Sequence, residues 1–329
     1  MKITLLTLFL LIAQPAIQAG ELSITDKGEE ILLVNREDFD AELLGRPFVN
    51  QTEIQQLLDH LDEQISEEPV NAKIDRSGEI IPGKDGTKVY KKEFMARFYQ
   101  FLYGAEKGEI SVPKLAVRPK VDSEILANIR TQQIAHYVSY FNSNNKERSH
   151  NIRLAAEALD SHVVFPGEVF SFNKAVGKRT KEKGYKTAPE IIKGEVTEGI
   201  GGGICQLSST LFNSVDKVGV KILERFSHSK RVPYVPEGRD ATVSWYGPDF
   251  TFKNQFNQPL LIRSRVDGGQ VSVTIYSSDV INFDPQKVAH DETGGDGEIN
   301  LSNDIVNRGF LINTKECGPL SFLVCYDIL

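Results

Sequence analysis

The sequence predicts a mixed α+β fold: a small N-terminal α+β module, then a mixed α/β domain in which an antiparallel sheet packs on a cysteine-bearing helix. Three observations support this prediction. The 329-residue chain is 40% hydrophobic and 25% charged, which is enough apolar material for a sizeable core. Residues 21 to about 120 combine amphipathic helical patterns with short strand signals, whereas residues 130–280 follow a different pattern that becomes strand-like from about residue 162. A glycine run leads directly into helix-like sequence at Cys205.

The first 19 residues have the pattern of a secretory signal peptide. Lys2 gives a positive start, residues 3–13 are apolar, Pro15 breaks the run, and Ala19 marks the expected cleavage site. An uncleaved anchor helix is the alternative, but the apolar run is shorter than the roughly 20 residues that a bilayer requires. We expect a secreted protein that meets the membrane only during export and works where disulfides persist.

The N-terminal module is predicted to span residues 20–121. An amphipathic helix begins at Thr52 and has an apolar face made of Ile54, Leu57, Leu58, Leu61 and Ile65. Turn signals at 77–78 and 85–86 indicate short strands, and prolines keep residues 110–121 extended. A second helix is expected to end at Gly104. The side chains of its apolar face, which point into the core, are Phe94, Phe98, Phe101 and Leu102.

The second domain is predicted to span residues 122–280, followed by a C-terminal tail at 281–329. Its first helices are expected at 122–141, capped by Asp122 or Ser123, and at 149–160, capped by Ser149. A further helix is expected from about Cys205 to Gly219. Strands are predicted at 162–173, 240–247, 250–255 and 260–277, the last as a hairpin that turns at 267–269.

Three cysteines raise the question of pairing in an exported protein. Cys317 and Cys325 flank a turn and a short apolar run, CGPLSFLVC, so we expect a disulfide across a C-terminal hairpin. Cys205 is then an odd thiol. It is either reactive or a small buried hydrophobic residue, and both hypotheses stay open.

The local sequence of Cys205 is typical of a reactive thiol. Gly201, Gly202 and Gly203 allow left-handed backbone angles and leave the space before the thiol free of side chains. At a helix start, unpaired N–H groups and the positive end of the dipole favour a thiolate, and the same N–H groups can hold an oxyanion. Gln206 either adds a side-chain donor or is simply a polar residue of the first helical turn.

A base and an acid follow Cys205 along the chain. His228 lies where the chain becomes extended after the helix, and Asp240 lies at the start of the next predicted strand. Adjacent antiparallel strands place imidazole and carboxylate together, so that the carboxylate fixes the tautomer while the other ring nitrogen faces the thiol. The order of elements is analogous to the papain and transglutaminase-like architecture. The alternative is a structural histidine and a turn-forming aspartate.

Other functional classes find no support in the sequence. The formal net charge is −7 and Lys and Arg form no block, so nucleic acid is not an expected partner. The other histidines are scattered without an HExxH motif, and no P-loop follows the glycine run, so we expect no metal and no cofactor. Arg179 and Thr180 lie in a basic loop that either binds a carboxylate ligand or is a solvated turn.

Five motifs between about residues 130 and 278 resemble the VanW family of bacterial exported proteins. In order, they are RSHNIRLAAEALD, FPGEVFSFNKAVGKRTKEKGYKTAPEI, GIGGGICQLSSTLFNSV, HSKRVPYVPEGRDATVSW and DFTFKNQFNQPLLIRSRVDGG. The family takes its name from a gene of some vancomycin-resistance clusters. Lys178 departs from its pattern, because relatives often have proline there. The preceding region, including IIPGKDGTKV, is similar to the peptidoglycan-binding module that often precedes VanW domains.

The resemblance implies a cell-envelope protein that acts on or binds peptidoglycan. One hypothesis is amide hydrolysis or transpeptidation of its peptide stems through a thioester, with Cys205 as nucleophile, His228 as base and Asp240 as the orienting acid. The expected substrate-binding residues are Gly201, Gly202, Gly203, Gln206, Arg179, Thr180 and Tyr185, the last taken from the resemblance. The alternative is a non-catalytic peptidoglycan-binding protein with a structural cysteine.

Overall fold

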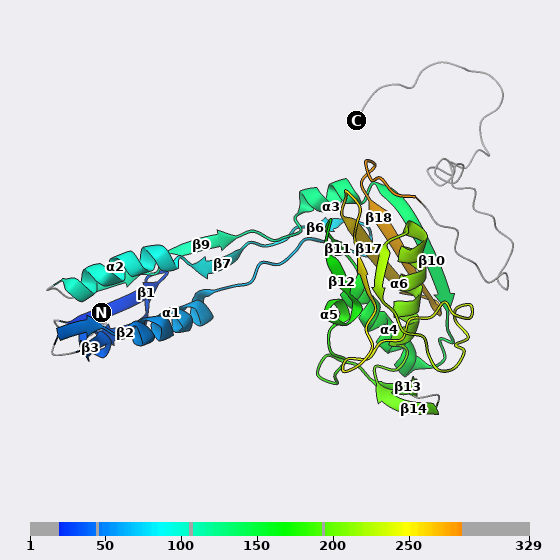
Figure 1. Cartoon of the computed structure of the whole chain (residues 1–329), viewed down its shortest axis with the longest axis horizontal. Coiled ribbons are helices and arrows are strands. Elements are labelled where there is room, and N and C mark those ends of the chain that lie inside the picture. The colour runs from blue at the N-terminus through cyan, green and yellow to red at the C-terminus, as the bar shows by residue number, and fades with distance from the viewer. Residues whose placement is uncertain (1–19, 44–45, 105–107, 193–194, 285–329) are drawn as a thin grey trace, which may run out of the picture. The chain divides into compact units, whose positions relative to one another are not determined.

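The computed structural model describes residues 20–43, 46–104, 108–192 and 195–284 (Figure 1). The predicted signal peptide and the predicted disulfide between Cys317 and Cys325 lie outside these residues. Within the described ranges the chain forms six α-helices and several small sheets, so the mixed α+β class is confirmed. None of the helices in these ranges is both long enough and apolar enough to span a membrane.

The N-terminal residues build a small sheet and two amphipathic helices around one core. The elements are β1 (Glu21–Asp26), β2 (Glu29–Asn35), the 3-10 helix η1 (Arg36–Phe39), β3 (Asp40–Leu43), β4 (Arg46–Val49), α1 (Gln51–Ile65), β7 (Gly86–Val89), α2 (Lys91–Tyr103), β8 (Gly108–Ser111) and β9 (Lys114–Val117). Strand β1 pairs antiparallel with β2 and parallel with β8. Leu22 and Ile24 of β1 pack with the apolar faces of both helices.

The predicted apolar faces of α1 and α2 are confirmed, because every residue expected on them is buried. The rings of Phe98 and Phe39 lie 4.9 Å apart, edge to face, at the centre of this core. Helix α1 begins at Gln51, and its cap lies two residues before the predicted Thr52. Asn50 rather than Thr52 is the cap, because Asn50 Oδ1 accepts hydrogen bonds from the N–H groups of Thr52 and Glu53 at 3.0 and 3.4 Å.

A four-stranded antiparallel sheet with the order β10-β18-β17-β11 lies among the elements that follow the N-terminal core (Figure 1). The elements are β5 (Lys73–Ile74), β6 (Ile80–Ile81), α3 (Ser123–Ile129), β10 (Gln132–Tyr140), α4 (Lys146–Leu159), β11 (His162–Val164), β12 (Val169–Ser171), α5 (Phe172–Val176), β13 (Thr187–Ile192), β14 (Glu195–Ile200), α6 (Ile204–Val218), β15 (Lys221–Glu224), β16 (Thr251–Lys253), β17 (Leu260–Asp267) and β18 (Gln270–Ser277).

The two faces of this sheet bury different helices. Helix α6 packs on β10 and β18, α4 packs on β17, and the two helices contact each other. Leu260 and Ile262 of β17 point into the core that these helices share, whereas Leu261 between them joins a second cluster with residues of α3. The sheet is therefore covered by α4 and α6 on one face and by α3 on the other.

The helix predicted over 122–141 is wrong in extent. It begins as expected at Asp122, whose side chain accepts a hydrogen bond from the N–H of Ile125 at 2.8 Å, but it ends at Ile129. Residues 132–140 instead form β10, because their inward side chains alternate and their backbone pairs along the length of β18. Alternation with period two therefore prevails over the helical propensity of the preceding residues.

Two further details differ from the prediction. The helix expected to begin at Ser149 begins at Lys146, because Asn145 Oδ1 caps the N–H of Arg148 at 3.0 Å. The strand expected over 240–247 is a loop in which Thr242 forms a single antiparallel bridge. The 260–277 hairpin and the end of α6 at Gly219, with φ 82°, are confirmed.

Candidate functional site

Cys205 is the second residue of α6, and the glycines before it fix how this helix begins. Gly203 precedes the helix with φ 105°, a left-handed angle that side chains other than glycine rarely adopt. A Cβ atom at Gly202 would lie 2.3 Å from the carbonyl oxygen of Ala188 in β13. The run therefore lets the chain turn tightly against β13 and deliver Cys205 to the first helical turn.

The polar side chains of α6 are buried, and they hold the loop at 239–243 against the helix. Ser208 Oγ donates to the carbonyl oxygen of Ala241 at 2.5 Å. Ser209 Oγ accepts from the Ala241 N–H at 2.9 Å and donates to the carbonyl oxygen of Cys205 at 2.7 Å. Because Ala241 follows Asp240 directly, these bonds set the position of the Asp240 carboxylate relative to Cys205.

Asp240 and His228 face each other on two antiparallel segments. Phe226 and Thr242 form an isolated bridge, and His228 and Asp240 each lie two residues inward from it. Oδ2 of Asp240 lies 2.6 Å from His228 Nδ1 and also accepts the backbone N–H of His228 at 2.6 Å. The carboxylate therefore fixes both the orientation and the tautomer of the imidazole.

The imidazole of His228 also interacts with Cys205, and this interaction shifts the pKa of both groups. Since Nδ1 binds Asp240, Nε2 is the ring nitrogen left free for the thiol. Burial opposes ionisation of the thiol, but the interaction with His228 lowers the pKa of Cys205 below its ordinary value. Burial would lower the pKa of His228, but Cys205 and then Asp240 raise it above its ordinary value.

Asp240 completes this coupling. Burial raises its pKa, but the backbone N–H and the ring of His228 together bring it below its ordinary value. The three directions favour a thiolate beside an imidazolium that a carboxylate supports. Sγ of Cys205 also lies 3.6 Å from Thr242 Oγ1 and 3.6 Å from the Val243 carbonyl oxygen, and the residue is partly exposed.

The other sequence-predicted residues make contacts with protein groups of their own. Gln206 is fully buried, and its amide binds protein groups of β10 and α4. Arg179 binds Asn173 Oδ1 at 2.7 Å. Thr180 Oγ1 accepts the N–H of Lys183 at 3.4 Å within a turn. Tyr185 is buried in the main core, and burial raises its pKa.

Arg148 is a site residue that the sequence did not indicate. It lies on α4, and its Nη2 donates to Gln206 Oε1 at 2.7 Å, directly beside Cys205. Its charge also interacts with Cys205. The segment around Arg148 reads as an ordinary amphipathic helix, so only the packing of α4 on α6 brings it to the thiol.

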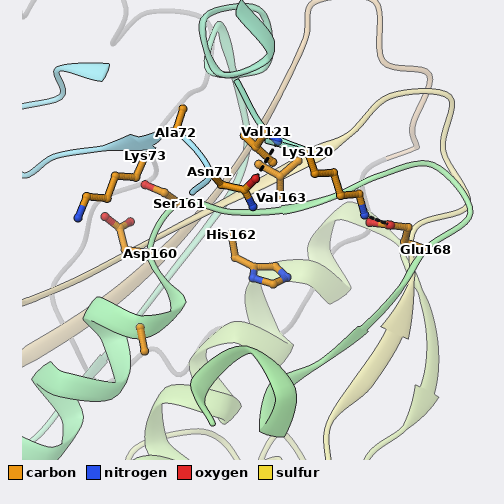
Figure 2. Close-up of a pocket in the computed structure, with 11 residues that line it drawn as sticks. Asn71, Ala72, Lys73, Lys120, Val121, Asp160, Ser161, His162, Val163 and Glu168 are labelled. Carbon is orange, nitrogen blue, oxygen red and sulfur yellow. Dashed lines mark hydrogen bonds and ion pairs between the residues drawn. The ribbon is translucent and has the colours of Figure 1, made fainter. Parts of the chain in front are cut away.

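A cavity of about 310 Å³ contains none of the predicted site residues (Figure 2). Its lining includes His162 and the ion pair between Lys120 and Glu168. Burial lowers the pKa of His162. In the part of the chain that the structure describes, no three His, Cys, Asp or Glu side chains are grouped closely enough to hold a metal ion.

Comparison with known proteins gives two family matches along the chain. The family described as "VanW like protein" matches residues 147–276, and that described as "Putative peptidoglycan binding domain" matches residues 20–111. YoaR of Bacillus subtilis is 54% identical over 284 residues, which are 86% of this chain and 94% of that protein. The vancomycin B-type resistance protein VanW of Enterococcus faecalis is 34% identical over 111 residues, which are 32% of this chain and 40% of that protein. No solved structure matches, so the analogy with the papain and transglutaminase-like architecture has no structural support.

Proposed function

The chain belongs to the VanW family, and from this premise we propose that it is a cysteine-dependent enzyme that acts on amide bonds in the peptide stems of peptidoglycan. The matched peptidoglycan-binding domain at residues 20–111 supports peptidoglycan as the partner and the cell envelope as the location. Export by the predicted signal peptide is part of the same proposal. The N-terminal domain would hold the protein on the polymer while the second domain acts on the peptides.

The observation that carries the proposal is the contact chain from Cys205 through His228 to Asp240. His228 is hydrogen-bonded to Asp240 and interacts with Cys205, and the thiol lies at the start of a helix. A structural cysteine needs neither a histidine partner nor a carboxylate behind that histidine. The same three groups in this order are what an activated thiol nucleophile requires.

The proposed reaction has two steps. The thiolate of Cys205 attacks the amide carbonyl carbon, a C–S bond forms, and the C–N bond breaks as His228 Nε2 gives its proton to the leaving amine. In the second step His228 takes a proton from water or from an acceptor amine, which attacks the thioester and releases the thiolate. Water gives hydrolysis, and an amine gives transpeptidation. Backbone N–H groups of the first turn of α6 would stabilise the oxyanion.

The test is product analysis with purified peptidoglycan and with soluble stem peptides. The wild-type protein should yield shortened stems or new cross-linked dimers, distinguished by mass spectrometry, and Cys205→Ala should yield neither. Cys205→Ser is a second inactive variant that tests for loss of packing, because it keeps the size of the side chain. Equal product from the wild type and Cys205→Ala would overturn the proposal.

A non-catalytic peptidoglycan-binding protein is the second candidate, and one observation favours it. Cys205 packs against the main hydrophobic core, as a structural thiol does. In that case the thiol should react slowly with iodoacetamide until the protein unfolds, and Cys205→Ala should bind insoluble peptidoglycan as tightly as the wild type. A thiol that reacts fast near neutral pH would exclude this candidate.

A further inference from the structure

Two arginines from different elements contact residues that neighbour Cys205 along the chain, and neither forms an ion pair with a described carboxylate. Arg148 projects from α4, and Arg179 lies in the loop after α5. Four other arginines in the described ranges form ion pairs with carboxylates within 4 Å, but Arg148 and Arg179 form none with any described residue. Neither charge is therefore neutralised by a direct ion pair, although the charge of Cys205 acts on both arginines and that of Asp249 acts on Arg179.

The glycines before Cys205 make room for these two side chains. A Cβ atom at Gly203 would lie 2.7 Å from Arg148 Cγ, and one at Gly201 would lie 3.0 Å from Cβ and Cγ of Arg179. Any larger side chain at either position would push an arginine away from the thiol. The glycine run therefore leaves space for the two arginine side chains and also allows the tight turn before the helix.

Neutral amides orient both guanidinium groups. Arg148 binds Gln206 Oε1 and Arg179 binds Asn173 Oδ1, each at 2.7 Å. The Gln206 amide is itself fixed by hydrogen bonds to Ser139 Oγ and the Tyr140 carbonyl oxygen at 2.9 and 3.0 Å. An amide acceptor positions a guanidinium without cancelling its charge, so the capacity to bind an anion is kept.

One donor of Arg179 is left unused. Its Nη2 atom is enclosed and has no hydrogen-bond partner among the described residues, although the side chain as a whole is partly exposed. A buried guanidinium N–H without a partner destabilises the folded state, and a bound water, ion or ligand can satisfy it. Burial lowers the pKa of both arginines, and the charge of Cys205 acts in the opposite direction on each of them.

We propose that Arg148 and Arg179 form a carboxylate-binding subsite beside Cys205, which holds a free carboxylate of the peptide substrate next to the bond that is attacked. The inference rests on the proposed function, because it assigns a substrate group to the same site. Guanidinium forks match the planar geometry of carboxylates, so the pair selects acid peptides over their amides.

The test uses two thiol reagents that differ only in charge, iodoacetate and iodoacetamide. Both react with the same thiolate, so the ratio of their rates does not depend on the pKa of Cys205 and reports only recognition of the carboxylate. The modified peptide that contains Cys205 is quantified by mass spectrometry, which separates it from Cys317 and Cys325. We expect this ratio to exceed that of free cysteine by about tenfold in the wild type.

The variants assign the preference to the two arginines. Arg179→Gln and Arg148→Gln should each bring the ratio of iodoacetate to iodoacetamide rates close to that of free cysteine. Arg179→Lys should retain only part of it, because a lysine keeps the charge but loses the fork. Arg153→Gln is the matched control, since Arg153 is exposed on the same helix as Arg148, and it should leave the ratio unchanged.

The outcomes separate the two proposals. A reactive Cys205 with no preference for iodoacetate, or a preference that survives both glutamine variants, would overturn the carboxylate subsite and leave the proposed function intact. A thiol that reacts with neither reagent would overturn both. A second experiment compares stem peptides that end in a carboxylate with the same peptides ending in a carboxamide, as protectants of Cys205 against iodoacetamide. If only the acid form protects, the subsite binds the terminal carboxylate of the peptide.

Discussion

His228 and Asp240 share one carboxylate oxygen, Asp240 Oδ2, which lies 2.6 Å from both the ring Nδ1 and the backbone N–H of His228. This double contact holds the imidazole in one orientation while its far nitrogen meets the thiol of Cys205. The loop that carries Asp240 is in turn held by serines of α6, the helix that begins beside Cys205. Helix α6 thus carries the nucleophile and also holds the loop of the acid, which in turn orients the base.

The ionisation of this pair predicts two different pH profiles. The pKa of Cys205 is lowered, so alkylation of the thiol should remain fast below the ordinary thiol pKa and slow only as pH falls through the lowered value. The pKa of His228 is raised, so amide cleavage, which needs the imidazolium as acid, should decline as pH rises through that raised value. Alkylation needs no acid and should not decline there. Stopped-flow alkylation and peptide cleavage across pH check both profiles.

Asp240→Asn should narrow the pH range in which Cys205 is a thiolate and His228 is an imidazolium, because both limits of this range move inward. Without the carboxylate the imidazolium is less stable, so the pKa of His228 falls and that of Cys205 rises, and amide cleavage should drop by about 100-fold or more. Asp267→Asn, in the exposed turn of the β17–β18 hairpin, makes the same chemical change away from the site and should leave cleavage unaffected. Equal pH profiles for the wild type and Asp240→Asn would show that the carboxylate does not act on the imidazole.

Ser209→Ala should weaken both the fold and the thiol chemistry. The substitution leaves the buried N–H of Ala241 without an acceptor, which costs about 1–3 kcal/mol in unfolding free energy. It also frees the loop that carries Asp240, so iodoacetamide should alkylate Cys205 more slowly at neutral pH. Urea unfolding and alkylation rates measure the two effects.

Ser214→Ala is the matched control for Ser209→Ala. Ser214 lies on the same helix, is equally buried, and donates to the carbonyl oxygen of Val273 at 3.0 Å, away from the loop. It should reduce stability without changing the alkylation rate. An equal loss of thiol reactivity in both variants would mean that the loop contact has no special role.

Gly202→Ala should destabilise the turn that leads into α6. Its Cβ would approach the Ala188 carbonyl oxygen to 2.3 Å, so backbone must shift, at a cost of about 1–3 kcal/mol in unfolding free energy. Thermal unfolding should show a lower midpoint, and the alkylation rate of Cys205 should fall with it. Gly247→Ala is the control, because its Cβ would meet no atom closer than 3.6 Å. Equal midpoints for Gly202→Ala and the wild type would contradict the close approach.

Local patterns were sufficient to predict much of the fold. The apolar faces of α1 and α2, the hairpin at 260–277 and the end of α6 at Gly219 follow from side-chain periodicity and turn residues, which act over a few positions. The same patterns assigned residues 132–140 wrongly to a helix. The side chains of a segment that follows a helix can fit helical or strand periodicity, and here pairing with β18 selects the strand. The N-caps of α1 and α4 were placed wrongly because several polar residues compete near each helix start, and the local geometry selects one of them.

The sequence by itself determined the helix at Cys205, the flexible run before it, and the presence of His228 and Asp240 in a suitable order. Only the tertiary structure decided three contacts. Asp240 binds His228 from a loop that forms only the Phe226–Thr242 β-bridge. The Gln206 amide binds protein groups, and one of them is Arg148, which thereby lies next to the segment that carries the thiol. The physical reason is the separation along the chain between the residues that interact. Periodicity and capping depend on neighbours along the chain, whereas these contacts join residues 12 to 67 positions apart, which only the packing of α4, α6 and the sheet can bring together.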